Sequence, residues 1–151
     1  MILMSTDVHR DWVDYNGHMN DAEYARVFSM AVEALMVHIG LDDQGRQHHE
    51  YTLYTLETHL CYLHEVKQGE QLQVSVAILD RDPKRLHLYF DLLDDHGRQV
   101  ATSEQMLLGI RTDRGQAAPF PSAVEQLIDS LPHLEVSAWP VAVGRRIGIR
   151  R

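Results

Sequence analysis

The stretch DYNGHMNDAEY, residues 14–24, joins a short polar loop to the start of the longest helical pattern in the chain. Asn20 followed by Glu23 is typical of a capping box, in which each side chain bonds the backbone N–H of the other residue. Apolar residues then recur at helical spacing up to Gly40, and glycine commonly ends helices. We therefore predict a helix from about Asp21 to Ile39, with the polar loop at its N-terminus.

The loop before this helix carries the groups that acyl chemistry uses. Asp14, Asn16 and His18 alternate with other residues, so in a locally extended segment their side chains point the same way. One face of the loop then presents a carboxylate, an amide and an imidazole. The spacing fits a structural interpretation equally well, because Asp and Asn before helices often serve only as caps and Asx turns.

The junction between loop and helix predicts an oxyanion site. Unpaired backbone N–H groups and the positive end of the helix dipole gather at a helix N-terminus, and such groups stabilise a developing oxyanion. The candidates are the N–H groups around Gly17, Met19 and Asn20.

Beyond the helix the hydrophobic pattern changes to a period of two. Apolar and polar residues alternate from Leu72 to Ile78, from Leu86 to Leu92, and again from Val100 to Arg111. These segments predict an antiparallel meander over about residues 71–111, with one apolar face that needs a cover. The long helix supplies that cover, so we predict an α+β fold in which an antiparallel sheet wraps round one long central helix.

Two further elements complete the predicted fold. A strand over Tyr51–Leu63 precedes the meander. Pro121 and Ser122 open a short late helix, and Glu125 completes a second capping box with Ser122. We predict one domain over residues 1–151, in which residues 112–151 form a loop, the short helix and a basic tail.

Several runs of this chain resemble hotdog-fold acyl-CoA thioesterases of the 4-hydroxybenzoyl-CoA thioesterase-like superfamily. The Asp-x-Asn-x-His spacing of the loop is similar to the catalytic motif of acyl carrier protein thioesterases, and the likeness extends roughly over Val8–Arg111. Within the family the sequence most resembles the thioesterase domain found with bacterial carnitine dehydrogenases. The shared runs are VDYNGHM at 13–19, the segment LETH at 56–59 and KRLHL at 84–88.

This resemblance implies a hotdog domain that hydrolyses an acyl-CoA thioester, betainyl-CoA in carnitine catabolism for the most similar domain. It also implies a homodimer or homotetramer whose active sites lie at the dimer interface. Because residues 1–7 show no signal-peptide pattern and no window suits a membrane span, we expect a soluble cytoplasmic protein.

One departure from the family pattern narrows the choice of catalytic residue. Many hotdog thioesterases carry an acidic residue on the helix where this chain has Ser29 and Met30, and Glu33 lies about one turn further on. We therefore assign the general base or nucleophile to Asp14, supported by Asn16 and His18.

Aromatic residues near the motif are candidates for the acyl subsite. Trp12, Tyr15 and Tyr54 can surround a trimethylammonium group by cation–π attraction, although aromatics beside a helix are more often core. Strict alternation along the Tyr51–Leu63 strand puts Tyr54 and Glu57 on opposite faces. Glu57 either binds the cationic head of the substrate, acts as a second acid/base group, or is an edge-strand charge that faces water.

The CoA phosphates require exposed cations. Arg81, Lys84 and Arg85 cluster at the predicted turn inside the meander, where they either bind phosphate or form an ordinary charged turn. The tail also ends in four arginines among its last seven residues, a pattern that usually serves solvation.

Composition excludes several other classes of protein. A net charge of −8 disfavours nucleic acid as a partner, and no window approaches the twenty apolar residues of a membrane span. The single cysteine, Cys61, forms no internal disulfide, and none of the ten histidines shows the i, i+4 pair with a flanking Glu that marks a zinc helix. We expect no metal and no cofactor.

Two other functions remain open at this stage. A hotdog dehydratase or hydratase would use His18 and Asp14 to move a proton beside a carbonyl. A non-catalytic acyl-CoA-binding module would keep the pocket without needing Asp14.

Overall fold

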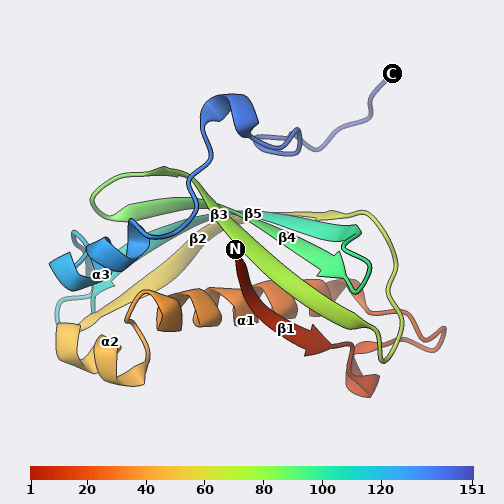
Figure 1. Ribbon diagram of the computed structural model, residues 1–151, viewed down its shortest axis with the longest axis horizontal. Helices are drawn as coiled ribbons and strands as arrows, with labels where there is room; N and C mark the ends of the chain where they lie inside the picture. Colours follow the sequence, from red (N-terminus) through yellow and green to blue (C-terminus); the bar gives the residue numbers. More distant parts are fainter.

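The structure is a computed structural model that describes residues 1–151, and it wraps a curved sheet over one long helix (Figure 1). In chain order the elements are β1 (Ile2–Asp7), η1 (Arg10–Trp12), α1 (Asp21–His38), α2 (Asp43–His49), β2 (Tyr51–Tyr62), β3 (Gln71–Arg81), β4 (Arg85–Asp94), β5 (Gln99–Arg111), β6 (Gln116–Ala117), α3 (Ser122–Ile128) and η2 (Val136–Ala138). The strand order is β1-β3-β4-β5-β2, with β6 beside β5 and every pair antiparallel. The predicted meander and central helix are confirmed.

The core lies between α1 and the concave face of the sheet. The alternating apolar residues of β4 are fully buried there, and the Phe90 ring meets Phe28 of α1 edge to face with centroids 6.3 Å apart. Each such side chain contributes roughly 1.5–3 kcal/mol through burial. The period-two pattern therefore becomes a sheet because α1 offers a matching apolar face.

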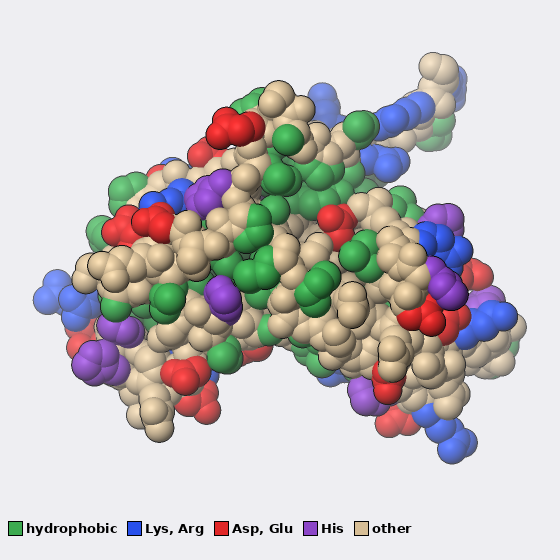
Figure 2. Space-filling view, in the orientation of Figure 1, with side chains coloured by type: hydrophobic (Ala, Val, Ile, Leu, Met, Phe, Trp, Pro, Cys, Tyr) green, Lys and Arg blue, Asp and Glu red, His purple; other side chains and the backbone are tan.

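The C-terminal segment covers part of the opposite, outer face of the sheet (Figure 1). Trp139 packs edge to face against His87 and donates its indole N–H to the Leu134 carbonyl. The Gly144 N–H donates to Glu104, whose other carboxylate oxygen lies 2.7 Å from His87. Figure 2 shows hydrophobic side chains gathered where this segment meets the sheet, with Lys and Arg along the projecting tail.

Three local predictions were wrong or incomplete. Residues 42–50 belong to no predicted element but contain α2, because the Asp42 carboxylate caps its start by accepting the Gly45 N–H. Strand β1 lies outside every predicted element and owes its order to pairing with the distant β3. The late helix is confirmed, but its N-cap is Pro121 and no side chain caps it, so the Ser122–Glu125 capping box does not form.

A bulge in β2 changes which residues share a face. The register with β5 shifts between Thr55 and Glu57, so Tyr54 faces Leu108 and Glu57 faces Met106. Because Leu108 and Met106 are two residues apart on β5, both lie on one face. Tyr54 and Glu57 thus share the outer face, and the prediction of opposite faces was wrong.

No single helix is long and apolar enough to cross a membrane. The α1–α2 pair, bent by 61°, passes a length and composition test together, as a mostly buried core helix can also do.

Gly109 of β5 provides a test of this packing. A Cβ there would lie 1.6 Å from the Tyr51 hydroxyl, which itself donates to the Ala118 carbonyl at 2.6 Å. Tyr51 is buried, so its ring has little room to yield. We expect Gly109→Ala to lower the free energy of unfolding by about 3 kcal/mol, the scale of overpacking a core, in urea titrations followed by tryptophan fluorescence.

The matched control is Gly148→Ala, whose added Cβ meets no atom within 4 Å. It should leave stability unchanged. Equal stability of the two variants would contradict the packing described for β5 and Tyr51.

Candidate functional site

Residues 14–18 form a tight turn. The Asp14 N–H donates to the His18 carbonyl at 2.9 Å, and the Gly17 N–H donates back to the Asp14 carbonyl at 2.9 Å. Gly17 takes a φ of +77°, which glycine adopts without steric cost. The prediction of an extended segment was therefore wrong, and alternation does not decide which way the polar side chains point.

The Asp14 carboxylate is part of this turn. Its Oδ1 accepts the Asn16 N–H at 2.8 Å and the His18 N–H at 3.2 Å, while Oδ2 has no hydrogen-bond partner within the chain. The residue is exposed, as is Asn16, whose side chain makes no hydrogen bond. One oxygen of Asp14 thus holds the turn and the other is available to react.

A second carboxylate, that of Glu65, lies beside the motif and was not among the predicted site residues. Glu65 belongs to the loop between β2 and β3, and its Oε2 is 3.3 Å from His18 Nδ1. The Met19 N–H donates to the Val66 carbonyl at 2.8 Å, and Gln68 donates to Gly17. These contacts fix the motif turn against residues 65–68, about fifty positions later in the chain.

The three N–H groups predicted as oxyanion donors are already occupied. Those of Gly17, Met19 and Asn20 donate to the carbonyls of Asp14, Val66 and Trp12. The Asn20 side chain caps α1 by accepting the Ala22 N–H at 3.0 Å. The Asp21 N–H, the first of the helix, has no partner within the chain and is therefore the candidate donor. The predicted capping box forms only in half, since Glu23 pairs with Arg26.

The predicted aromatic box is not assembled within one chain. Trp12 packs against the core and the His9 ring, Tyr15 is 97% exposed, and Tyr54 lies on the outer face of the sheet. Two other tyrosines lie at the motif instead. Tyr24 of α1 and Tyr62 of β2 stand edge to face with ring centroids 5.2 Å apart.

Glu57 is exposed and lies away from the motif. It lines a cavity of about 310 Å³ on the outer face, together with His59 and the His87–Glu104 pair. A role for Glu57 in the site of its own chain gains no support from this position.

The three predicted CoA-binding cations have different surroundings. Arg81 bonds Glu125 and Asp129 and so ties α3 to the sheet. Arg85 bonds Asp82, and this hydrogen bond is the main reason that the pKa of Asp82 falls to about 2. Lys84 is exposed and makes no ion pair. It is the member of the cluster that is free to bind a phosphate.

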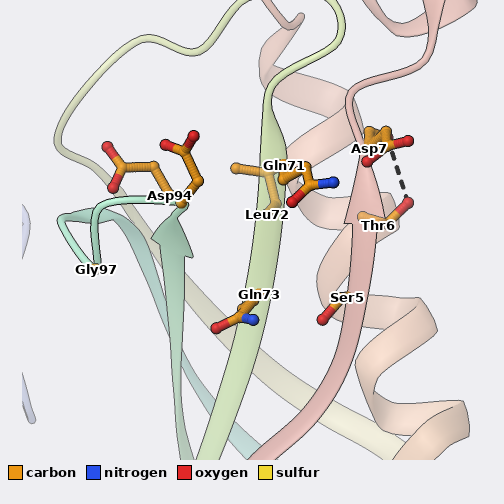
Figure 3. Close-up of a pocket in the computed structure, with 9 residues that line it drawn as sticks. Ser5, Thr6, Asp7, Gln71, Leu72, Gln73, Asp94 and Gly97 are labelled. Carbon is orange, nitrogen blue, oxygen red and sulfur yellow. Dashed lines mark hydrogen bonds between the residues drawn. The ribbon is translucent and has the colours of Figure 1, made fainter.

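A cavity of about 580 Å³ lies elsewhere. It opens between the ends of β1, β3 and β4 and is lined by polar groups that include Asp7, Asp94 and Asp95 (Figure 3). Asp94 is itself committed to a turn, where it accepts the N–H groups of His96 and Arg98. The acidic lining of this cavity repels phosphates, so the cavity does not suit the CoA part of a substrate.

Comparison with known proteins places this geometry in a family. The profile described as the thioesterase-like superfamily matches residues 8–128. The chain belongs to this superfamily. It is 47% identical over 147 residues to the betainyl-CoA thioesterase of Pseudomonas aeruginosa, covering 95% of this chain and 92% of that protein. The predicted resemblance to hotdog-fold thioesterases is confirmed.

One further sequence relative and one solved structure are consistent with this family. An L-carnitine dehydrogenase/betainyl-CoA thioesterase of Agrobacterium fabrum is 39% identical over 96% of this chain, which spans 30% of that longer protein. A hypothetical protein of Staphylococcus aureus, solved in complex with CoA, superposes with a TM-score of 0.88 at 33% identity, covering 99% of this chain and 96% of that one.

The capping role of Asn20 leads to a test of how the site is held. We expect Asn20→Ala to lower the free energy of unfolding by about 1 kcal/mol, because the Ala22 N–H loses its acceptor. Asn20→Asp keeps an oxygen in place and should retain stability. Urea titrations of both variants check this, and an equal loss in Asn20→Asp would show that the side-chain oxygen does not cap α1.

Proposed function

We propose that this protein hydrolyses an acyl-CoA thioester, and that the acyl group is betainyl, in the breakdown of carnitine. The observation that carries the proposal is 47% identity to a betainyl-CoA thioesterase over nearly the whole of both chains. The fusion of a similar segment to L-carnitine dehydrogenase in a second relative supports the carnitine context. We further propose a cytoplasmic location, in keeping with a CoA thioester as substrate.

In the proposed mechanism Asp14 either activates a water as general base or attacks the thioester carbonyl to form a mixed anhydride. Its Oδ1 is held by two N–H groups, so the carboxylate is oriented before substrate binds. Asn16 and His18, the latter bonded to Glu65, orient the water. A thiolate leaves readily, so the reaction needs no strong general acid.

The oxygen of the thioester carbonyl requires a donor as charge develops on it. We propose that the unpaired Asp21 N–H supplies this donor, helped by the positive end of the α1 dipole. Asp21 replaces Gly17, Met19 and Asn20 in this role.

We propose that the working form is a homodimer, with a homotetramer as a further assembly. Strand β2 is twelve residues long, lies at the sheet edge, and exposes Tyr54, Leu56 and Tyr62, an arrangement that favours pairing with another chain. Lys84 and the motif lie at opposite ends of β3, whose eleven residues span roughly 35 Å. A partner lying along β2 would bring its own Lys84 turn toward the motif.

The proposed reaction is tested by following free thiol with betainyl-CoA and with short- to medium-chain acyl-CoAs. We expect release from betainyl-CoA, reduced at least about a hundredfold in Asp14→Asn, the scale of losing an acid/base group. The amide retains an oxygen acceptor for the turn, so circular dichroism and the thermal midpoint should match those of the unsubstituted protein.

Each other outcome of this assay points elsewhere. Unchanged release in Asp14→Asn removes Asp14 from the mechanism. Absence of release from every thioester favours a binding module, and activity confined to enoyl-CoA substrates favours a hydratase.

Sharing of sites between protomers is tested by subunit mixing. Lys84→Glu should raise KM for the CoA substrate, and Asp14→Asn should abolish turnover. If each site combines the Asp14 of one protomer with the Lys84 of its partner, a mixed dimer carries one intact site. After equal mixing, half of all dimers contain one chain of each variant, and each of these has one intact site of two. The mixture should therefore recover about a quarter of the original activity at low substrate. No recovery on mixing would show that each chain holds its own phosphate contact.

A further inference from the structure

A cavity of about 260 Å³ adjoins the motif and has a lining of unusual chemistry. Two tyrosines, Tyr24 and Tyr62, line it together with Asp21, Glu65 and His64. Met19 and Leu63 add apolar surface, and no Lys or Arg lines it. The cavity thus combines aromatic side chains with two acidic residues.

The two rings are held in place by hydrogen bonds to the backbone. The Tyr24 hydroxyl donates to the His64 carbonyl at 3.2 Å, and the Tyr62 hydroxyl donates to the Asp21 carbonyl at 3.4 Å. Burial raises the pKa of both phenols above the usual range, with nearby carboxylates adding to the shift. Both rings therefore remain neutral. Tyr24 is buried in the core, whereas Tyr62 is 52% exposed, so Tyr62 is the ring that a ligand can reach.

The cavity adjoins the groups proposed above to act on the thioester. Asp21 contributes both to its lining and to the unpaired N–H at the start of α1, and Glu65 contacts the motif residue His18. A thioester carbonyl bonded to the Asp21 N–H would direct its α-substituent toward these side chains. In a betainyl group the quaternary nitrogen is one methylene beyond that carbonyl.

We propose that this cavity is the subsite for the quaternary ammonium head of the acyl group, with the Tyr62 ring, backed by Tyr24, supplying the cation–π contact and Asp21 and Glu65 supplying negative charge. The proposal rests on the thioesterase function proposed above and names the side chains that select its substrate. The other acidic cavity, beside Asp94, has no aromatic lining, and the cavity beside Glu57 contains Arg145.

The experiment compares betainyl-CoA with 3,3-dimethylbutanoyl-CoA, in which a neutral carbon replaces the quaternary nitrogen and the shape is kept. The measured quantity is the ratio of kcat/KM for the cationic substrate to that for the neutral one. We expect the protein to prefer the cation by at least about tenfold, and Tyr62→Leu and Glu65→Gln each to lower the ratio by about fivefold. A general effect on the motif changes both substrates alike and cancels in the ratio.

Matched controls separate the ring and the charge from other effects. Tyr62→Phe keeps the ring and should keep the ratio, and Asp95→Asn removes a carboxylate that lines a different cavity and should also keep it. A ratio near one in the unsubstituted protein overturns the proposal, as does a ratio unchanged in both Tyr62→Leu and Glu65→Gln.

A binding readout distinguishes failure of this subsite from failure of the thioesterase function. Tetramethylammonium is titrated into the protein and followed by saturation-transfer NMR. Transfer that is present in the unsubstituted protein and lost in Tyr62→Leu supports the subsite even if no thioester is hydrolysed. Absence of transfer in the unsubstituted protein overturns it, whatever the thiol assay shows.

Discussion

α1 buries seven side chains against the concave face of the sheet, and four of them are 1% exposed or less. A helix packed at this density does not slide along its axis, because the neighbouring side chains already fill the available space. The first turn of α1 is thereby fixed relative to the end of β2 and the start of β3. The position of the motif turn is fixed as well, since the N–H groups of Met19 and Asn20 donate to the Val66 and Trp12 carbonyls immediately before the helix begins.

The structural and chemical interpretations of the motif are compatible. Asp14 forms an Asx-type turn through Oδ1, as the structural interpretation requires, and that bond leaves Oδ2 unpaired. Asn20 is likewise a helix cap, and by capping the Ala22 N–H it leaves the Asp21 N–H as the unpaired donor at the helix start. Groups fixed in this way need no reorganisation when charge develops beside them, and this is the main source of electrostatic catalysis.

The sequence predicts the parts of the fold that local pattern controls. The period-two runs of β3 to β5 and the 3.6-residue period of α1 are long enough to be read without a partner. The features that the sequence does not predict depend on contacts with distant residues. The bulge at Thr55–Glu57 depends on register with β5, the occupation of the Met19 N–H depends on Val66, and the loss of Arg81 as a phosphate ligand depends on carboxylates of α3. Glu65 joins the site for the same reason, since nothing near it in sequence marks it.

Charge sets the direction in which the proposed substrate would bind. The ligand carries a cation at its acyl end and phosphates at its nucleotide end, while the chain as a whole carries −8. Screening at physiological salt limits each interaction to about 8 Å, so each end of the ligand responds to nearby groups and not to the net charge. Asp21 and Glu65 at the motif attract the cation and repel phosphate, whereas Lys84 remains unpaired because Asp82 is bonded to Arg85. The acidic subsite and the free lysine lie at opposite ends of one sheet, so in the proposed dimer the lysine that meets the phosphates is the one that the second copy brings alongside.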